Sequence, residues 1–212
     1  PKKKFFGTDI DPEIIAEARR EGIFGNDADL EVRDFILNPP KKLFKAIVAN
    51  PPYMRHHRLS LELKNYLRKM SFLNLGDTLD GRAGLHIYFL IQALSLLDKG
   101  GRLAFIMPAD TCEGVFSKKL WNWIAKKFQI DGVITFEHKA TPFPGVDTNA
   151  VIFLIKNEKP KEKLKWVKCL APQSKGLFEF LKNDLVNGNY KDIDIYDRDL
   201  TEAISIGLSR MP

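Results

Sequence analysis

At 212 residues, with 44% hydrophobic and 28% charged side chains, the chain is long enough to bury a sizeable core as one domain, or as one domain with an appendage. Its net charge of +6 is compatible with a polyanionic partner but does not require one. No apolar segment approaches the roughly 20 residues that span a bilayer, and the first residues lack the apolar region of a signal peptide, so we expect no membrane partner.

The first fifty residues alternate between strand and helix patterns. A helix is predicted at residues 11–23, with Asp11 as its N-cap, Pro12 at its first position and Gly22 at its end. Short apolar segments predict three strands, at residues 4–10, 30–35 and 45–50.

The pattern continues through the middle of the chain. The apolar stretch "GLHIYFLIQALSLLD" predicts a helix at residues 84–98, stopped by Lys99-Gly100-Gly101, and large side chains at helical spacing predict another at residues 116–128. Further strands are predicted at residues 102–108, 131–137 and 150–157.

Strands and helices in alternation predict an α/β fold with a mostly parallel sheet and right-handed connections. A loop with Pro and Gly, rather than a helix, separates the strands at 131–137 and 150–157, so we expect these two to form an antiparallel hairpin at one edge. The character of the sequence changes after Lys156. We therefore predict a core over residues 1–157, followed at 158–212 by a basic linker or the start of a C-terminal region.

A polar tip ends the third predicted strand. Asn50-Pro51-Pro52-Tyr53 follows the apolar residues 45–49, and ligands in open parallel sheets bind beyond the carboxyl ends of the strands. The Asn50 side chain and the Pro51 backbone each offer a carbonyl oxygen, and two rigid acceptors can take both hydrogens of one exocyclic NH2 group. Tyr53 offers a ring on which a planar base can stack. The alternative interpretation is a loop whose prolines only end a strand.

Two acceptors on one exocyclic amine change the reactivity of its nitrogen. The amine of adenine N6 or cytosine N4 is a poor nucleophile because its lone pair is delocalised into the ring. Accepting both hydrogens localises electron density on the nitrogen, so that it can attack an electrophilic methyl group. The tip therefore indicates an amino-methyltransferase site.

The motif resembles the catalytic motif of the N6-adenine DNA methyltransferases of restriction-modification systems, the gamma class of amino-methyltransferases, and the similarity extends from about Phe5 to Asn157. The resemblance implies a Rossmann-like, S-adenosylmethionine-dependent methyltransferase fold in a prokaryotic cytoplasm, with its catalytic core at residues 1–157. It also implies a glycine-rich motif upstream of Lys4, so we expect the chain to be an N-terminally truncated fragment of that core.

The same resemblance assigns cofactor contacts. "FFGTDIDPEII" resembles the family's second motif, in which a carboxylate binds the ribose hydroxyls of S-adenosylmethionine; the matching residue is Asp9, with Ile10 against the cofactor adenine. "VRDF" resembles the third motif and implies Asp34 at the adenine amino group and Phe35 beside its ring. Phe143, in "ATPFPG", matches the aromatic residue that stacks on the flipped target adenine opposite Tyr53.

A cationic segment follows the motif. We expect Arg55, Arg58 and Lys64 to contact DNA phosphates, with a solvated helix face as the alternative. The adjacent His56 and His57 have no acid or cysteine at ligand spacing, so we assign them phosphate or surface roles. The two cysteines, Cys112 and Cys169, form no CxxC pair, so we predict neither metal nor disulfides.

The leading hypothesis is a site-specific DNA methyltransferase that flips adenine out of the double helix and methylates its N6 amine. Its partners would be double-stranded DNA and the specificity or restriction subunits or domains of a restriction-modification system, and residues 158–212 would lead toward a target-recognition region. Two alternatives stay open. Release-factor glutamine methyltransferases and some RNA methyltransferases use a similar tip, and a fragment of this kind could bind DNA or assemble with partners without catalysis.

Overall fold

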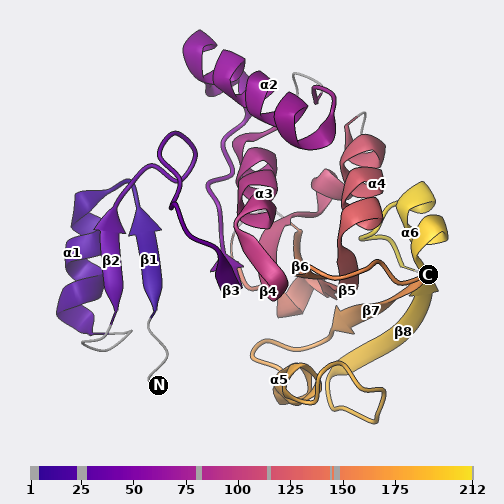
Figure 1. Ribbon diagram of the computed structural model, residues 1–212. Helices are drawn as coiled ribbons and strands as arrows, with labels where there is room; N and C mark the ends of the chain where they lie inside the picture. Colours follow the sequence, from indigo (N-terminus) through magenta and orange to yellow (C-terminus); the bar gives the residue numbers. More distant parts are fainter. Residues whose placement is uncertain are drawn as a thin grey trace. The chain divides into compact units, whose positions relative to one another are not determined.

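The computed structural model divides the chain into two compact units, residues 1–43 and residues 44–212. Each unit has a sheet of its own, and each is described by itself (Figure 1). The residues that the structure describes are 5–22, 28–79, 83–113, 116–143, 145 and 149–211.

The first unit is a strand, helix and parallel strand. β1 (Phe6–Asp9) pairs in parallel with β2 (Asp29–Val32), and α1 (Pro12–Glu21) connects them. The Asp11 side chain accepts the N–H of Glu13 at 2.8 Å and caps the helix, and Gly22 ends it in the left-handed conformation, with φ 62°. The predicted strand, cap and stop signals of this unit are confirmed.

The second unit is built on a six-stranded sheet with the order β3-β4-β6-β5-β7-β8. β3, β4, β5 and β7 run in one direction, whereas β6 and β8 run in the opposite direction. The strand bounds are β3 Phe44–Ala49, β4 Leu97–Pro108, β5 Gln129–Phe136, β6 Ala150–Lys156, β7 Lys163–Cys169 and β8 Ile193–Asp199.

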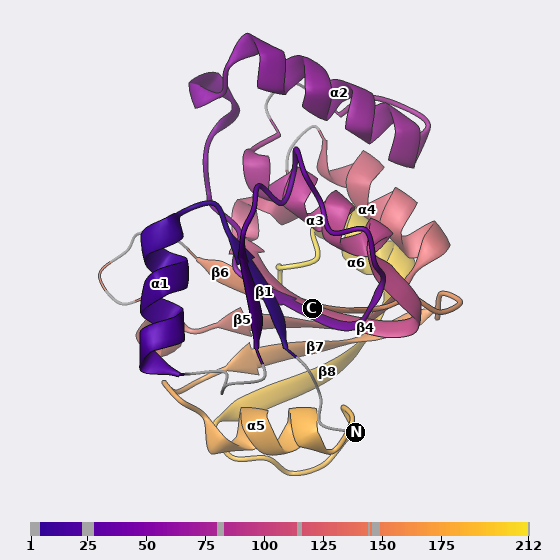
Figure 2. The ribbon, with the colours of Figure 1, turned by 60° about the vertical axis from the view of Figure 1, so that its left-hand side comes forward.

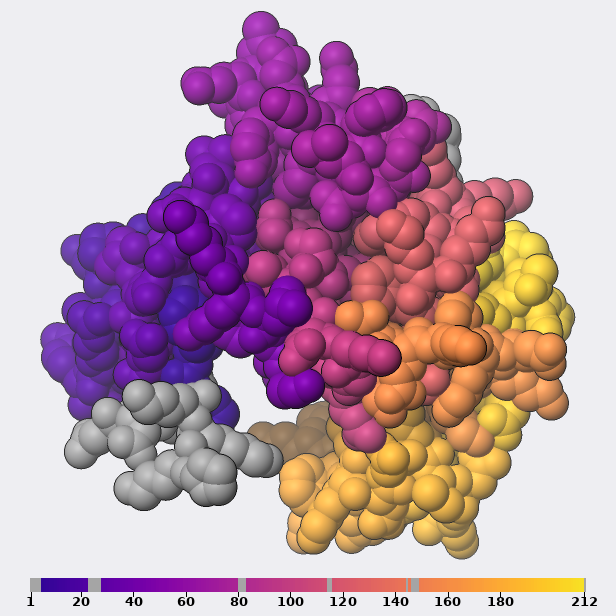
Figure 3. Space-filling model, viewed as in Figure 1, coloured from indigo at the N-terminus to yellow at the C-terminus, as the bar shows by residue number. Residues whose placement is uncertain are grey.

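Helices cover both faces of this sheet. Figure 2 shows α3, α4 and α6 on one face and α5 on the other, and in Figure 3 the side chains of α2 form the top of the second unit. The helix bounds are α2 Leu61–Leu75, α3 Leu85–Ser95, α4 Ser117–Lys127, α5 Lys175–Lys182 and α6 Leu200–Ile206, with short 3-10 helices η1 His56–Arg58, η2 Ala109–Cys112 and η3 His138–Ala140.

Aromatic side chains fill the core on each face. On the α4 side, Trp121 is 1% exposed and packs against Phe153 of β6, with ring centroids 4.3 Å apart. On the α5 side, the buried Phe180 packs against Ile134 and Val167 of the sheet. Since both faces are covered, the central strands carry nearly continuous apolar side chains, as the sequence predicted.

The antiparallel pairing of β5 with β6 is confirmed, but β6 is not at the edge of the sheet. It lies between β4 and β5 and pairs antiparallel with both. The antiparallel strand that does form an edge is β8, which pairs with β7. The prediction placed the last strand at an edge because it treated the remaining residues as a tail.

Residues 158–212 contain β7, α5, β8 and α6, and β7 pairs in parallel with β5 of the main sheet. In β7 and β8, charged residues alternate with apolar residues, and lysines of β7 lie opposite aspartates of β8. In the β7–β8 register, Lys163 is opposite Asp199, Lys165 opposite Asp197 and Lys168 opposite Asp194. Such opposite-charge pairs support strand pairing, so these lysines serve the sheet.

β4 begins at Leu97, earlier than predicted, and includes the two glycines predicted to stop the preceding helix. Gly100 has φ 72°, which favours glycine, and a Cβ on Gly101 would lie 2.9 Å from the Phe44 carbonyl oxygen. The register with β3 shifts at the same place, between Phe44 and Ala46. The glycines therefore permit a bulged strand to pass close to its neighbour.

β3 pairs with β4 along one side, and no other described strand pairs with it. Every side chain of β3 is exposed or half-buried, and Val48 is 85% exposed. This strand leads directly into Asn50.

Candidate functional site

Three segments lie at the same end of the strands of the six-stranded sheet. Since β3, β4 and β5 run in one direction, Asn50 after β3, η2 after β4 and the loop holding Phe143 after β5 all lie beyond carboxyl ends of strands. This is the edge where α/β sheets bind ligands.

The motif alternates between buried and exposed residues. Asn50 is exposed, Pro51 is buried, Pro52 is exposed and Tyr53 is half-buried. Two prolines fix two successive φ angles, so the backbone here has little freedom. The buried Pro51 ring anchors the turn, and the Asn50 amide next to it remains open to solvent.

A cavity of about 400 Å³ lies beside the motif and is lined by Tyr53, Arg55, His57 and Arg58. Both arginines that are predicted to bind phosphates thus line the same cavity as the predicted stacking ring. Lys64 lies on α2 and is not part of this lining.

Tyr53 contacts a residue that the sequence reasoning missed. Its ring meets the His86 ring nearly edge-on, at 81° with centroids 5.8 Å apart. The Tyr53 hydroxyl is buried and has no hydrogen-bond partner among the described residues, and the same is true of His86 Nδ1. Burial raises the pKa of Tyr53, so the hydroxyl stays protonated and remains a donor.

His86 is held from several directions. Its Nε2 lies 3.2 Å from Thr111 Oγ1 of η2, and the backbone oxygen of Thr111 accepts the Trp121 Nε1–H at 3.2 Å. The preceding residue, Leu85, donates its N–H to the Met54 carbonyl at 2.9 Å. The start of α3 is therefore tied both to the motif loop and to η2.

A signal for His86 was present in the sequence. It is the one histidine in the apolar stretch Gly84–Asp98, and it stands at the beginning of that helix. In an α/β sheet, the beginning of a helix that precedes a parallel strand lies at the ligand-binding edge.

His86 makes stability depend on pH. Burial lowers the pKa of His86 from 6.5 to about 4, against a smaller opposite effect of Asp110. Between these two pKa values His86 is protonated in the unfolded chain and neutral in the folded chain. Roughly 3 kcal/mol of stability is therefore lost as the pH falls from 6.5 to about 4. Urea unfolding at several pH values checks this: the His86→Gln variant should lose less stability over this range than the wild type, and equal losses would contradict the assignment.

Two acids of the first unit each use one carboxylate oxygen to shape the turn after their strand. Asp9 Oδ1 accepts the N–H of Asp11 at 2.9 Å, and Asp34 Oδ1 accepts the N–H groups of Ile36 and Leu37, each at 2.8 Å. The second oxygen of each has no hydrogen bond to the described residues. Both carboxylates are thus fixed in direction with one oxygen still available.

The remaining predicted site residues are apolar and partly open. Ile10 is 68% exposed directly after β1, and Phe35 is half-buried after β2. Phe143 is half-buried, and its N–H donates to Thr141 Oγ1 at 3.3 Å. The structure gives no contact between Phe143 and Tyr53.

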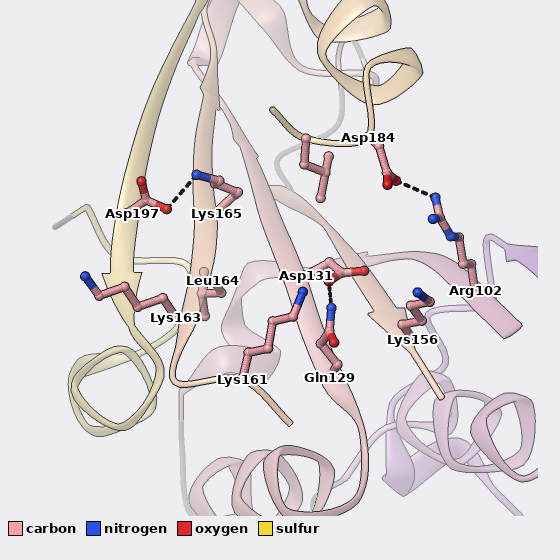
Figure 4. A pocket seen from close by; sticks show the side chains of 11 residues that line it. Arg102, Gln129, Asp131, Lys156, Lys161, Lys163, Leu164, Lys165, Asp184 and Asp197 are labelled. Carbon is pink, nitrogen blue, oxygen red and sulfur yellow. Dashed lines mark hydrogen bonds and ion pairs between the residues drawn. The ribbon is translucent and has the colours of Figure 1, made fainter. Parts of the chain in front are cut away.

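A second cavity, of about 270 Å³, lies near the amino ends of β5 and β7, away from the motif edge (Figure 4). Two ion pairs lie in its lining. Arg102 pairs with Asp184 at 2.7 Å, and Lys165 pairs with Asp197 at 2.6 Å. These pairs join the sheet to the segment after α5 and connect β7 with β8.

Other features define no further site within the described residues. No group of three or more His, Cys, Asp or Glu residues could hold a metal ion there, and no helix is long and apolar enough to cross a membrane. Cys112 and Cys169 are both free and buried, and burial raises the pKa of the Cys112 thiol to about 12.

Solved structures share this fold. The type IIG restriction endonuclease BpuSI is 19% identical and superposes with a TM-score of 0.74 over 95% of this chain and 26% of its own. A methyltransferase subunit of a type I restriction-modification system from Streptococcus thermophilus gives 0.71, with 15% identity, 95% of this chain and 46% of its own. A Listeria monocytogenes protein described as a class I S-adenosylmethionine-dependent methyltransferase gives 0.67, with 16% identity, 86% and 54%. The fold is therefore that of the class I S-adenosylmethionine-dependent methyltransferases.

Sequence comparison is more specific. The Eco57I restriction-modification methylase family model matches residues 3–143, and the chain belongs to this family. The type II methyltransferase M.AccI of Acinetobacter calcoaceticus is 24% identical over 158 residues, which are 74% of this chain and 29% of M.AccI. M.TthHB8I of Thermus thermophilus is 31% identical over 152 residues, which are 70% of this chain and 33% of that protein. The chain thus spans a fifth to a third of the length of the curated relatives it matches, from 20% to 33%.

Proposed function

We propose that this chain forms part of the catalytic domain of a DNA methyltransferase of a restriction-modification system, which methylates the N6 amine of a flipped adenine. The observation that carries the proposal is the Asn50 amide, exposed on a rigid proline turn beyond the carboxyl end of β3, beside Tyr53 and an open cavity. Family membership and the type II methyltransferase relatives support the same function.

The residues of the tip perform positioning and polarisation. The Asn50 side-chain oxygen and the Pro51 carbonyl accept the two hydrogens of the amine, and the Tyr53 ring stacks against the base, with Phe143 on its other face. No general base is needed, because the amine loses a proton after it has become cationic. Catalysis then depends on orientation and on the placement of partial charges.

The first unit offers groups that fit S-adenosylmethionine. This cofactor supplies an electrophilic methyl group on a sulfonium. The available oxygen of Asp9 suits the ribose hydroxyls, and that of Asp34 suits the adenine amine, because both carboxylates are held by their turns. The exposed Ile10 and half-buried Phe35 provide apolar surface for the adenine ring.

Arg55 and Arg58 would hold the phosphates that flank the flipped base, with Lys64 further along α2. We expect Arg58→Ala to weaken DNA binding several-fold and to lower the slope of log K against log salt by about 0.9, the value for one phosphate contact. Fluorescence anisotropy with duplex DNA at several salt concentrations measures both. The control is Lys161→Ala, an exposed cation in the loop between β6 and β7, and equal losses in both variants would contradict the assignment.

The substrate class is tested by incubating the full-length gene product with labelled S-adenosylmethionine and, in separate reactions, duplex DNA, RNA or a glutamine-containing protein. Labelled methyl groups should enter duplex DNA, and not RNA or a glutamine-containing protein. Transfer to RNA or protein alone would favour the alternatives with the same tip. Binding of DNA without any transfer would favour a non-catalytic assembly role.

A further inference from the structure

The Tyr53–His86 contact contains two buried polar atoms, the Tyr53 hydroxyl and His86 Nδ1. Nε2 of His86 lies 3.2 Å from Thr111 Oγ1, and in the tautomer with its proton on Nε2 the ring donates there and Nδ1 is left as an acceptor. The Tyr53 hydroxyl is a donor. Neither Nδ1 nor the hydroxyl has a hydrogen-bond partner among the described residues.

Leaving a buried donor and a buried acceptor unpaired costs free energy, and here they belong to two rings that already touch. The rings lie close together, with centroids 5.8 Å apart, and a bond between the two atoms needs a movement of Tyr53, because His86 has little freedom. A Cβ on Gly84 would lie 2.6 Å from His86 Cε1 and 2.9 Å from Nδ1, so this edge of the histidine ring packs directly on the glycine backbone.

We propose that His86 carries its proton on Nε2, that the Tyr53 hydroxyl donates a hydrogen bond to His86 Nδ1 when the target base is stacked, and that His86 is thereby a positioning residue for the stacking ring. This inference rests on the proposed function of Tyr53. Thr111 and Trp121 extend the support, because they fix the histidine from its other nitrogen.

Neutral His86 is required for this role, since a doubly protonated ring has no acceptor nitrogen. The acid that faces it is Asp110 of η2, and burial outweighs the effect of Asp110 on the histidine pKa. With its pKa lowered to about 4, the histidine is neutral near pH 7.

A double-mutant cycle tests the bond in the full-length gene product, with single-turnover methyl transfer to duplex DNA as the readout. Tyr53→Phe removes only the hydroxyl and should lower the rate about five- to tenfold in the wild type, the effect of one hydrogen bond. In a His86→Phe background the same substitution should change the rate less than twofold. Loss of the Thr111 contact is common to both His86→Phe proteins and cancels.

Further readouts separate positioning from folding. kcat should fall while the KM for DNA is unchanged, and circular dichroism reports whether each variant folds. If His86→Phe does not fold, His86→Gln replaces it, because its amide reaches the Nε2 position but offers nothing at Nδ1. His86→Asn keeps an acceptor near Nδ1. In this background Tyr53→Phe should therefore lower the rate more than it does in the His86→Phe background.

The outcomes distinguish the two hypotheses. If the wild type transfers no methyl group to DNA, the proposed function is overturned, and this inference with it. If the wild type is active and Tyr53→Phe has the same effect in both backgrounds, or none in either, only the hydrogen bond is overturned.

Discussion

Replacing Asn50 by alanine should lower the rate of methyl transfer to DNA by about 10²- to 10³-fold, the usual cost of removing one preorganised hydrogen-bonding group from a reacting centre. The amide is exposed beside a buried proline, so its removal should not disturb the fold. The KM for DNA should change little, because the stacking ring and the arginines remain. Single-turnover kinetics with labelled S-adenosylmethionine separates these effects.

Two matched variants sharpen this result. Asn50→Asp keeps an acceptor oxygen in place and should retain more activity than Asn50→Ala. Asn65→Ala removes an exposed amide from α2 and should leave the rate unchanged. A rate for Asn50→Ala that equals that of Asn65→Ala would mean that the amide does not act on the amine.

The largest effect on stability is expected for Trp121→Ala, at about 3–5 kcal/mol. Trp121 is 1% exposed, packs against Phe153 between α4 and the sheet, and donates its indole N–H to Thr111. Its removal leaves a cavity and an unpaired carbonyl beside the histidine that contacts the motif. Urea unfolding followed by far-ultraviolet circular dichroism measures the loss.

A second tryptophan on the same helix provides the control. Trp123 is half-buried, meets Phe128 edge-on and donates its indole N–H to the Asn74 carbonyl at 3.0 Å. Trp123→Ala removes one hydrogen bond and little core, so it should cost roughly 1–2 kcal/mol. Equal losses for both tryptophans would show that the core does not depend on Trp121 as described.

Local signals predicted much of the fold. Asp11, Pro12 and Gly22 fixed the ends of α1, because caps and stops act within a few residues. The position of Asn50 after a strand followed in the same way from apolar residues and two prolines. These features need no knowledge of distant parts of the chain.

What was missed depends on partners far away in the sequence. The strand character of "KLKWVKC" becomes evident only when its lysines meet the aspartates of β8, about thirty residues later. The bulged start of β4 depends on how closely the Phe44 carbonyl approaches Gly101. His86 is similar, since its importance lies in contacts with Tyr53 and Thr111, each more than twenty residues away.

The most direct test of the account is the identity of the modified nucleoside. Duplex DNA is methylated by the full-length gene product, digested to nucleosides and analysed by mass spectrometry. We predict a methylated exocyclic amine, because two fixed oxygen acceptors activate such an amine, and under the proposed function the product is N6-methyladenine. Methylation of a ring carbon, as in 5-methylcytosine, would contradict the account, since these acceptors have no means of activating a carbon atom.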